Sequence, residues 1–435
     1  MLLHPLLFWS AYPDPFGAFF SFGLSVDKLS LIVLFCIGLV ALISIMVGKA
    51  TIDDARRRFY FINLLLISVI GMNTAVLSTD IFSLYVFIEI TALASFLLIG
   101  IFRDRFGIEA SFKYLILSSL ATVFMLSSIG LFVLVAGGTS FTVIYGAFSG
   151  GPANFLLQLA VVLFICGLLI KSGVIPFHGW LPDAYTASPA AASVFLAGIV
   201  TKVCGVYVLL RLFISVFSIY PALKDAIMIL GLLSIFAGAF AAITQNNLKR
   251  MLSYSSISQV GYIILALGCA TPLAFCGAVF HFLNHAVFKS LLFVNIAAIE
   301  RATGRVEIDK IGSMALSMRL TGLTSLFGFF SAAGIPPFAG FWSKLIIIIA
   351  LLESGKTFYA LAAIVASILT VAYFLYLERS LFFRADDKAN VQPLNKVSFN
   401  LIFPQALLAL ITIGMGLGFP FVLNTWILPL EGLVR

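Results

Sequence analysis

The chain has few charged residues and no long polar segment. Only 10% of its 435 residues are charged and 62% are hydrophobic, whereas a soluble domain carries roughly 25% charged residues. This composition excludes an ordinary water-soluble globular protein. It also favours one membrane domain over the two or three soluble domains that the length would otherwise suggest.

Short motifs for metal or cofactor chemistry are also missing. The five cysteines form no CxxC or other metal-binding spacing, and no phosphate loop, Ser-His-Asp triad, Rossmann glycine pattern or haem signature is found. We therefore expect the chain to bind no metal or cofactor and to have no catalytic chemistry of its own. The first residues, MLLHPLLFWSAYPDP, lack a basic region, so no cleavable signal peptide is expected.

Hydrophobic runs of about 20 residues, the length that crosses a bilayer, recur along the chain. Reading hydropathy with breaks at charges and at Pro, Gly or Asn clusters predicts an all-α polytopic membrane protein with about twelve transmembrane helices. The predicted spans are 28–48, 58–78, 81–101, 110–136, 155–182, 190–216, 226–244, 251–270, 274–299, 318–352, 357–380 and 400–424. Spans 155–182 and 318–352 are overlong and contain Gly and Pro, so we expect each to be a broken helix.

Lysine and arginine are distributed unevenly between the predicted loops. Sixteen of the 26 fall on one side of the membrane and five on the other. Because cytoplasmic loops carry the excess of positive charge, the richer side is predicted to be cytoplasmic. Both termini are then outside, in what we expect to be a prokaryotic cytoplasmic membrane. Topology thus explains the net charge of +8 without nucleic acid as a partner.

Five lysines remain inside the predicted spans: Lys113, Lys171, Lys202, Lys289 and Lys344. An ionisable group at this depth costs at least about 2.5 kcal/mol on insertion scales. Lysine, unlike arginine, can release its proton when it is desolvated, which suits a group that exchanges protons. For Lys113 and Lys344, the alternative is a side chain that reaches the membrane interface.

A sequence repeat relates two parts of the chain. GVIPFHGW, from Gly173, is similar to GIPPFAGF, from Gly334, and Glu109–Lys113 is similar to His285–Lys289. The repeats run from 58 to 216 and from 226 to 381, between an N-terminal part with the first span (1–57) and a C-terminal loop, span and tail (382–435). Five spans in each copy force opposite orientations. Two five-helix inverted repeats, each with one broken helix, are typical of ion-coupled transporters with a site at the midplane.

Further ionisable residues accompany the lysines. Glu89 is the only acidic residue in the middle of a predicted span, and with Lys171 it can form an ion pair whose opening would move a proton; the alternative is a pair that only holds helices together. His281, His285 and Lys289 share one helix face because they are spaced by four. They predict a proton relay or packed core histidines, and without an HExxH glutamate they predict no metal site.

At these residues the chain resembles the antiporter-like membrane subunits shared by respiratory complex I, Mrp-type Na⁺/H⁺ antiporters and membrane-bound energy-converting hydrogenases. The resemblance covers roughly residues 25–400. It is carried by the stretch from Asp80 to Glu89 and by GLLIKSGVIPFHGWLPDAYTASPAAASVFLAGIVTKVCGVY, NNLKRMLSYSSISQVGY, NHAVFKSLLF and GIPPFAGFWSK.

The resemblance assigns roles to residues of this chain. It implies that Glu89 and Lys171 form the input pair, that Lys202 is the central relay, and that Lys344 is the terminal exchange residue. The residues implied to complete the proton path are His285 and Lys289 on the central axis, with Asp80, Lys113, His178, Gln259 and His281 in support. The chain departs from the family at Gln259, where some relatives carry histidine, at Lys344, where some carry glutamate, and in having twelve predicted spans instead of fourteen.

The function implied is proton translocation within a membrane-bound, redox-driven complex of the complex I or hydrogenase type. The expected partners are other membrane subunits, further antiporter-like subunits among them, and peripheral redox subunits that would hold any Fe–S or metal centre. The alternative is a subunit of an Mrp-type Na⁺/H⁺ antiporter, which needs no redox partner. A carrier for bicarbonate or an organic solute is less favoured, because the intramembrane charges are spread along the chain.

Overall fold

The structure, a computed structural model, describes residues 22–149, 154–217, 220–312, 314–315, 317–383 and 397–433. These residues form helices joined by short turns, with three isolated β-bridges and no strand among them. The predicted all-α class is confirmed. Residues 1–21, 384–396 and 434–435 are among those outside the described residues, and with them Arg384, Lys388, Lys396 and Arg435 of the charge count.

Aspartate and asparagine residues fix where several helices of the first half begin. Asp27, Asp54, Asp80, Asp104 and Asn154 each accept a hydrogen bond from a backbone N–H of the first turn, which satisfies a donor that the helix itself leaves free. The elements are α1 (Lys28–Thr51), α2 (Ala55–Leu77), α3 (Ile81–Ile99), α4 (Arg105–Ala136), α5 (Phe141–Ser149), α6 (Phe155–Ser172), α7 (Trp180–Ala187), α8 (Ala190–Phe195), the π-helical η1 (Leu196–Val200) and η2 (Lys202–Tyr207), and α9 (Val208–Ser215).

Side-chain caps also begin several helices of the second half. Asn247, Thr271 and Ser398 cap α11, α12 and α16. The elements are α10 (Pro221–Ile243), α11 (Leu248–Cys269), α12 (Pro272–Thr303), η3 (Ile308–Lys310), α13 (Arg319–Ala333), α14 (Ala339–Glu353), α15 (Thr357–Glu378), η4 (Arg379–Phe383), α16 (Phe399–Leu417), α17 (Phe419–Val422), η5 (Leu423–Ile427) and η6 (Leu428–Leu433).

The described helices reproduce the predicted spans. Eleven helical segments are long and apolar enough to cross a membrane. The remaining predicted span, 318–352, is divided between α13 and α14, each of 15 residues. Counting that pair as one broken helix confirms about twelve spans. The short helix α5 and η6 are additions that hydropathy did not predict, whereas the predicted span 400–424 is divided among α16, α17 and the start of η5.

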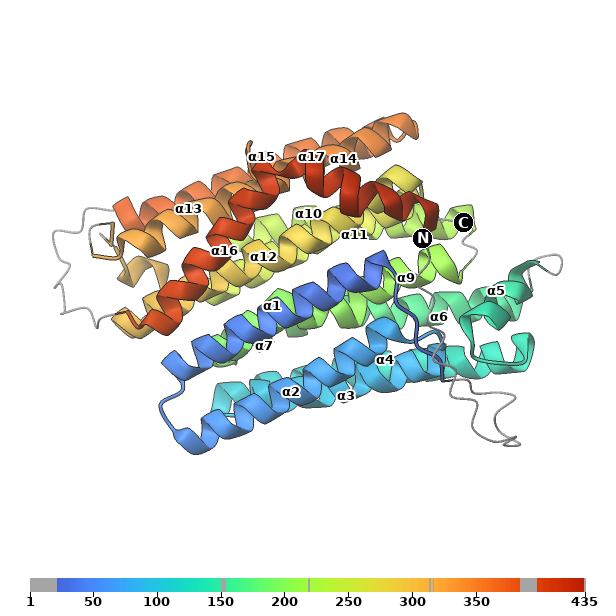
Figure 1. Cartoon of the computed structure of the whole chain (residues 1–435), viewed down its shortest axis with the longest axis horizontal. Helices are drawn as coiled ribbons and strands as arrows, with labels where there is room; N and C mark the ends of the chain where they lie inside the picture. The colour runs from blue at the N-terminus through green and yellow to red at the C-terminus, as the bar shows by residue number, and fades with distance from the viewer. Residues whose placement is uncertain are drawn as a thin grey trace.

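Both predicted broken helices are present. α6 ends at Gly173 with a φ of 66°, and α13 ends at Gly334 with a φ of 82°, a left-handed conformation that glycine adopts without strain. A cis peptide bond precedes Pro176 in the first break and Pro337 in the second. Figure 1 shows α6–α7 and α13–α14 running in opposite directions, as inverted repeats require. The exact limits of the two repeats stay a prediction.

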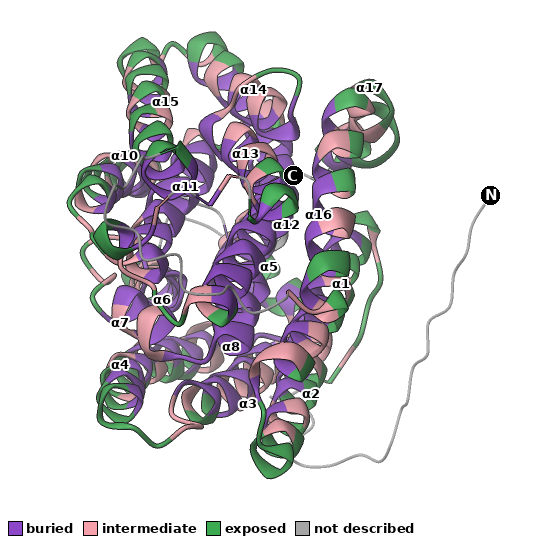
Figure 2. Cartoon of the chain, turned by 90° about the vertical axis from the view of Figure 1, so that its left-hand side faces the viewer, coloured by how far each residue is buried: buried purple, intermediate pink, exposed green. Residues whose placement is uncertain are grey.

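α12 lies at the centre of the bundle. It packs against α1, α8, α11, α13, α14 and α16, and every residue of an apolar 18-residue stretch of the helix is buried. Figure 2 shows buried residues gathered on α12 and α8 and exposed residues on the outer faces of the surrounding helices. Many of these outer residues are large and apolar, such as Phe112, Phe240 and Ile368. Such a surface suits contact with lipid or with other membrane proteins.

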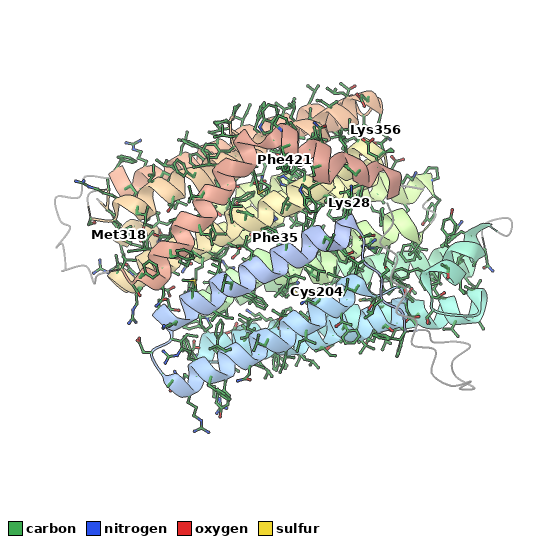
Figure 3. All side chains as sticks on the ribbon, in the orientation of Figure 1. Lys28, Phe35, Cys204, Met318, Lys356 and Phe421 are labelled. Carbon is green, nitrogen blue, oxygen red and sulfur yellow. The ribbon has the colours of Figure 1, made fainter. Side chains whose placement is uncertain are left out.

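Residues that the charge count assigned to opposite sides of the membrane lie at opposite ends of the bundle where Figure 3 labels them. Figure 3 places Lys28 and Lys356 at one end and Met318, which precedes Arg319, at the other. α1 begins and η6 ends at the same end of the bundle (Figure 1). This arrangement agrees with the predicted two-sided distribution of positive charge. The end that bears Met318 is called the arginine-rich end below.

One charged clamp ties the start of α1 to α9. Arg211 Nη2 donates to Asp27 Oδ1 at 2.9 Å, Arg211 Nη1 bonds the other carboxylate oxygen, and Arg211 Nε donates to Tyr207 Oη at 3.0 Å. Tyr207 Oη in turn donates to the Val76 carbonyl at 2.6 Å. Burial alone would raise the pKa of Asp27, but the hydrogen bonds and charge of Arg211, with help from Ser30, lower it to about 2.

We expect Asp27→Asn to destabilise the solubilised protein by about 2 kcal/mol at neutral pH, because a charge-assisted pair and an N-cap are weakened together. The carboxylate stabilises the fold only while it is ionised. Its contribution is complete above the ordinary value of 3.8 and is lost as the pH falls towards about 2. The melting temperatures of wild type and variant should therefore converge as the pH falls from 3.8 towards about 2.

Asp225→Asn is the matched control for this clamp, since Asp225 pairs with Lys356 at 3.0 Å on the surface, with 56% of its side chain exposed. An exposed pair contributes at most about 1 kcal/mol. A gap between wild type and Asp27→Asn that stays constant from neutral pH to pH 2 would contradict the assignment.

Candidate proton pathway

The structure brings Glu89 and Lys171 together from helices 82 residues apart in sequence. Lys171 Nζ lies 2.5 Å from Glu89 Oε1 and donates to Ser118 Oγ at 2.9 Å. The Lys171 side chain is 2% exposed and that of Glu89 is 22% exposed. Lys171 stands in the last turn of α6, where the backbone carbonyls favour a positive charge. Three helices, α3, α4 and α6, thus build this charged pair beside the first break.

The helix that carries Lys202 packs directly against this pair. A Cβ added at Gly205 of η2 would lie 2.1 Å from Ser172 Oγ, so only glycine allows the end of α6 to approach so closely. Charges on Lys171 and Glu89 act on Cys204, two residues after Lys202. The order along the fold is therefore ion pair, then η2, then Lys202.

Lys202 is buried at the start of a π-helical turn. Its Nζ donates to the carbonyl of Ala197 in the preceding π segment, and the residue is 1% exposed. No carboxylate forms an ion pair with it among the described residues. A buried lysine without a counter-charge is held by backbone dipoles alone and is suited to exist as a neutral amine.

His281, His285 and Lys289 form a line along α12 and are fully buried. His281 Nδ1 lies 2.9 Å from Ser343 Oγ, and the two histidine rings are 6.2 Å apart between centroids. Lys289 Nζ donates to Ser255 Oγ at 2.9 Å and to a backbone carbonyl of α11. Charges on Lys202, Lys289 and Lys344 all act on His285. His285 therefore lies within reach of the charges of all three lysines; that it joins two halves of a proton path stays a prediction.

Several buried polar atoms along this line make no hydrogen bond of normal length and angle within the described residues. They are Nε2 of His281, both ring nitrogens of His285, and both side-chain polar atoms of Gln259. A buried polar atom without a hydrogen bond costs about 1–3 kcal/mol, and ordered water is the usual remedy. Orphaned donors and acceptors in a row are what a water-filled proton wire requires.

Lys344 occupies the second break in a way that parallels Lys171 in the first. Its Nζ donates to the carbonyls of Ala332 and Ala333 at 2.9 and 3.4 Å, and it lies 4.6 Å from the centre of the Tyr262 ring. These carbonyls end α13, so a positive charge there is favoured by the helix terminus. Lys344 is 3% exposed, so its side chain does not reach the surface of this chain.

Three of the predicted supporting residues have a clear structural setting. Asp80 caps α3 and accepts a hydrogen bond from Thr139. The Lys113 side chain is 46% exposed and pairs with Glu109 at 2.7 Å and with Asp183 of α7 at 2.9 Å. His178 lies in the first break, with Nδ1 buried and without a partner. Whether these residues carry protons stays a prediction.

Asp183 links the short helix α7 to two neighbours. It accepts from Lys113 of α4 and, at 2.5 Å, from Arg250 of α11. Burial would raise the pKa of Asp183, but these two cations outweigh it and hold the pKa below its ordinary value. The half-helix after the first break is therefore pinned at its charged end by ion pairs.

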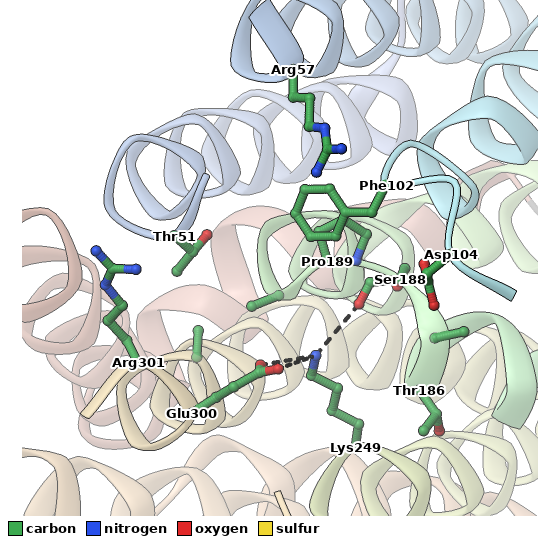
Figure 4. Close-up of a pocket in the computed structure, with 13 residues that line it drawn as sticks. Thr51, Arg57, Phe102, Asp104, Thr186, Ser188, Pro189, Lys249, Glu300 and Arg301 are labelled. Atoms are coloured by element: carbon green, nitrogen blue, oxygen red, sulfur yellow. Dashed lines mark hydrogen bonds and ion pairs between the residues drawn. The ribbon is translucent and has the colours of Figure 1, made fainter. Parts of the chain in front are cut away.

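A cavity of about 500 Å³ lies beside α7 and α8 and was not predicted from the sequence. Figure 4 shows the Lys249–Glu300 ion pair inside it, with Arg57 and Arg301 approaching from other sides. Lys249 Nζ lies 2.8 Å from Glu300 Oε2. The cavity walls also include Thr51, Phe102, Asp104, Thr186, Ala187, Ser188, Pro189, Ala190 and Ala297. Lys249 and Glu300 sit near helix ends, where hydropathy does not distinguish a buried pair from loop charges.

Gly340 marks the tightest contact across the second break. A Cβ at this position would lie 1.6 Å from the Ser331 carbonyl oxygen. We expect Gly340→Ala to cost more than about 3 kcal/mol and to prevent α14 from presenting Lys344 to the end of α13. The yield and melting temperature of the solubilised protein should both fall.

Gly179 is the matched control, because it holds the same place in the first repeat and a Cβ there meets nothing within 4 Å. Its φ of −57° is accessible to alanine, so Gly179→Ala should leave stability unchanged or raise it by up to about 1 kcal/mol. Equal losses in the two variants would show that the crowding at Gly340 is not the cause.

The fold and this buried line define an ion-translocating polytopic membrane protein. Residues 78–370 match the family described as NADH:quinone oxidoreductase/Mrp antiporter, transmembrane. The chain belongs to this family of antiporter-like membrane subunits.

Similar proteins and solved structures include subunits of an antiporter and of respiratory complexes. The chain is 29% identical over 364 residues to a Na⁺/H⁺ antiporter subunit of Alkalihalophilus pseudofirmus, covering 83% of this chain and 72% of that one. It is 34% identical over 374 residues to an NADH-quinone oxidoreductase subunit of Desulforudis audaxviator, covering 84% and 73%. A chain of the membrane-bound sulfane sulfur reductase, an archaeal respiratory membrane complex, superposes with a TM-score of 0.88 at 26% identity, covering 99% of this chain and 85% of that one.

Proposed function

We propose that this chain is a proton-translocating, antiporter-like subunit of a membrane-bound, redox-driven complex of the complex I or energy-converting hydrogenase type. The observation that carries the proposal is the buried series Glu89, Lys171, Lys202, His285, Lys289 and Lys344, with lysines beside both helix breaks and orphaned polar atoms between them. The similarity to a membrane subunit of NADH-quinone oxidoreductase supports the redox-driven assignment.

The proposed transfer begins at the input pair. When Glu89 moves away, Lys171 keeps its buried site but loses its counter-charge, so burial favours the neutral amine. Lys171 then releases a proton towards Lys202, whose amine has no carboxylate partner and is free to accept it. The positive charge of protonated Lys202 then disfavours a positive charge on Lys289 and on His285, and through His285 it disfavours the proton on Lys344. The proton at Lys344 is thereby driven out through the second half.

The partners in this proposal are other membrane subunits, further antiporter-like subunits among them, and peripheral redox subunits that hold the Fe–S or metal centres. The chain lies in a prokaryotic cytoplasmic membrane with the arginine-rich end inside and both termini outside. Support for this orientation comes from the excess of lysine and arginine in the loops of one side.

The second candidate is a subunit of an Mrp-type Na⁺/H⁺ antiporter, favoured by the similarity to the Na⁺/H⁺ antiporter relative. The lysine series serves either assignment, since both require a path for protons. The partners separate them, because only the redox-driven complex contains electron carriers.

Mild purification from native membranes with mass spectrometry of the co-purifying proteins tests the proposal. Recovery of dehydrogenase- or hydrogenase-like subunits, with electron transfer that acidifies sealed vesicles, is the expected result. Small hydrophobic partners alone, with Na⁺-dependent proton flux and no electron donor, would favour the second candidate. Solute uptake without proton movement would overturn both.

A further inference from the structure

A corner near the arginine-rich end holds buried polar side chains that the proposed pathway does not use. The corner is formed by α12, α13, α15 and α16. Three residues of one face of α13 each hydrogen-bond a side chain from another helix. The pairs are Thr321 with Gln405 of α16 at 3.1 Å, Thr324 with Asn295 of α12 at 3.1 Å, and Ser325 with Glu378 of α15. All six side chains are buried.

Glu378 is the unusual member of this corner, because none of the described residues forms an ion pair with it. It is 3% exposed. Arg379 and Arg319, at the adjoining helix ends, are both exposed. Burying an isolated carboxylate costs several kcal/mol or more, and a carboxyl group avoids that cost by keeping its proton.

Two buried polar atoms of the corner make no hydrogen bond among the described residues. Ser325 Oγ contacts Glu378 Oε1, whereas Oε2 of the same carboxyl is buried and has no partner. Nδ2 of Asn295, on the other side of Thr324, is likewise buried and unpartnered. A single hydroxyl contact suits a neutral carboxylic acid better than a carboxylate, which normally accepts several charge-assisted hydrogen bonds.

α13 connects this corner with the second break. Ser331, six residues or about 9 Å beyond Ser325 along the helix, donates to Asn284 Oδ1 at 2.9 Å. The carbonyls of Ala332 and Ala333 follow, and these hold Lys344. Asn284 Nδ2 is again buried and unpartnered. α13 therefore contacts Glu378 through Ser325 near one end and Lys344 through its terminal carbonyls at the other.

We propose that Glu378 is an additional proton-binding residue of the second repeat, which holds a proton in the resting state and exchanges it between the arginine-rich end and Lys344. This inference rests on the proposed function for its role in transport, but the protonation of Glu378 stands independently of it. Ser325 is a positioning residue that orients the acid.

Infrared difference spectroscopy of the purified complex tests the protonation directly. Subtracting the spectrum of Glu378→Gln from that of wild type at neutral pH should reveal the carbonyl stretch of a neutral carboxylic acid. Ser325→Ala should keep this band but shift its frequency, because its hydrogen bond is lost. Glu353→Gln is the matched control, since Glu353 is exposed at the end of α14, and it should leave the band unchanged. A difference spectrum without the acid band overturns the inference.

Proton flux in sealed vesicles tests the role in transport. Glu378→Gln, in complexes that assemble normally, should reduce flux by at least about tenfold, whereas Glu353→Gln should match wild type. An acid band with unchanged flux in Glu378→Gln would show a merely structural acid and overturn the transport role. If the wild-type complex moves no protons, the proposed function fails, and the infrared band still decides whether Glu378 binds a proton.

Discussion

Replacing Lys171 with alanine, or Glu89 with glutamine, is expected to abolish proton translocation by the assembled complex. The pair lies beside the first break, and its lysine is almost fully buried. Without Lys171 the proposed path loses the group that passes a proton from the break to η2. Without the Glu89 charge, Lys171 is left unpaired, which costs about 3–5 kcal/mol when it remains charged. Flux measured with a pH-sensitive dye in sealed vesicles should fall to background.

Two further variants separate transport from assembly. The double variant Glu89→Gln, Lys171→Met leaves no unpaired charge, so it should assemble better than Glu89→Gln and still fail to translocate. Lys28→Ala removes an exposed lysine at the end of the bundle (Figure 3) and should change neither property. Normal flux in the double variant would contradict the role assigned to the pair.

Replacing Lys344 with arginine is expected to preserve the fold and to eliminate proton exchange. Arginine keeps the positive charge that the terminal carbonyls of α13 favour, and it keeps contact with the Tyr262 ring. It cannot release a proton under physiological conditions. The melting temperature should therefore change little while vesicle flux is lost, and Lys344→Ala should lose both flux and some stability.

Lys356→Arg provides the comparison for Lys344→Arg, since Lys356 lies on the surface and pairs with Asp225. It should retain full flux and stability. A Lys344→Arg complex that still translocates protons would indicate that this lysine acts only as a fixed charge.

Much of the fold could be predicted because its signals are local. Apolar runs of membrane length marked the spans, and Gly with Pro marked both breaks, where Gly173 and Gly334 supply the positive φ that ends each helix. The motif repeat predicted opposite orientations, and Figure 1 agrees. The π-helical turns could not be predicted, because the shift to a wider turn depends on how η2 packs against α6.

The site could be predicted only in part, because burial depends on neighbours. The lysines in spans were found by counting charges, yet Lys113 lies at the surface in an ion-paired cluster, whereas Lys202 is buried with only a backbone partner. Glu378 was missed because it stands beside Arg379 near the end of a predicted span, where charged residues are common and do not indicate a buried site. Only the packing of α13 against α15 shows that its carboxyl is buried.

The deep burial of α11 and α12 has a consequence for biogenesis. These two helices have the lowest mean hydropathy of the eleven described spans. In an apolar 18-residue stretch of each, 89% of the residues of α11 and 100% of those of α12 are buried. A segment that carries Lys289 and two histidines enters lipid reluctantly when it leaves the translocon alone. We therefore expect α12 to insert only when helices synthesised earlier, α1 and α8 among them, are present to pack against it. The residues that we propose to carry protons therefore also make the order of membrane integration part of how this protein matures.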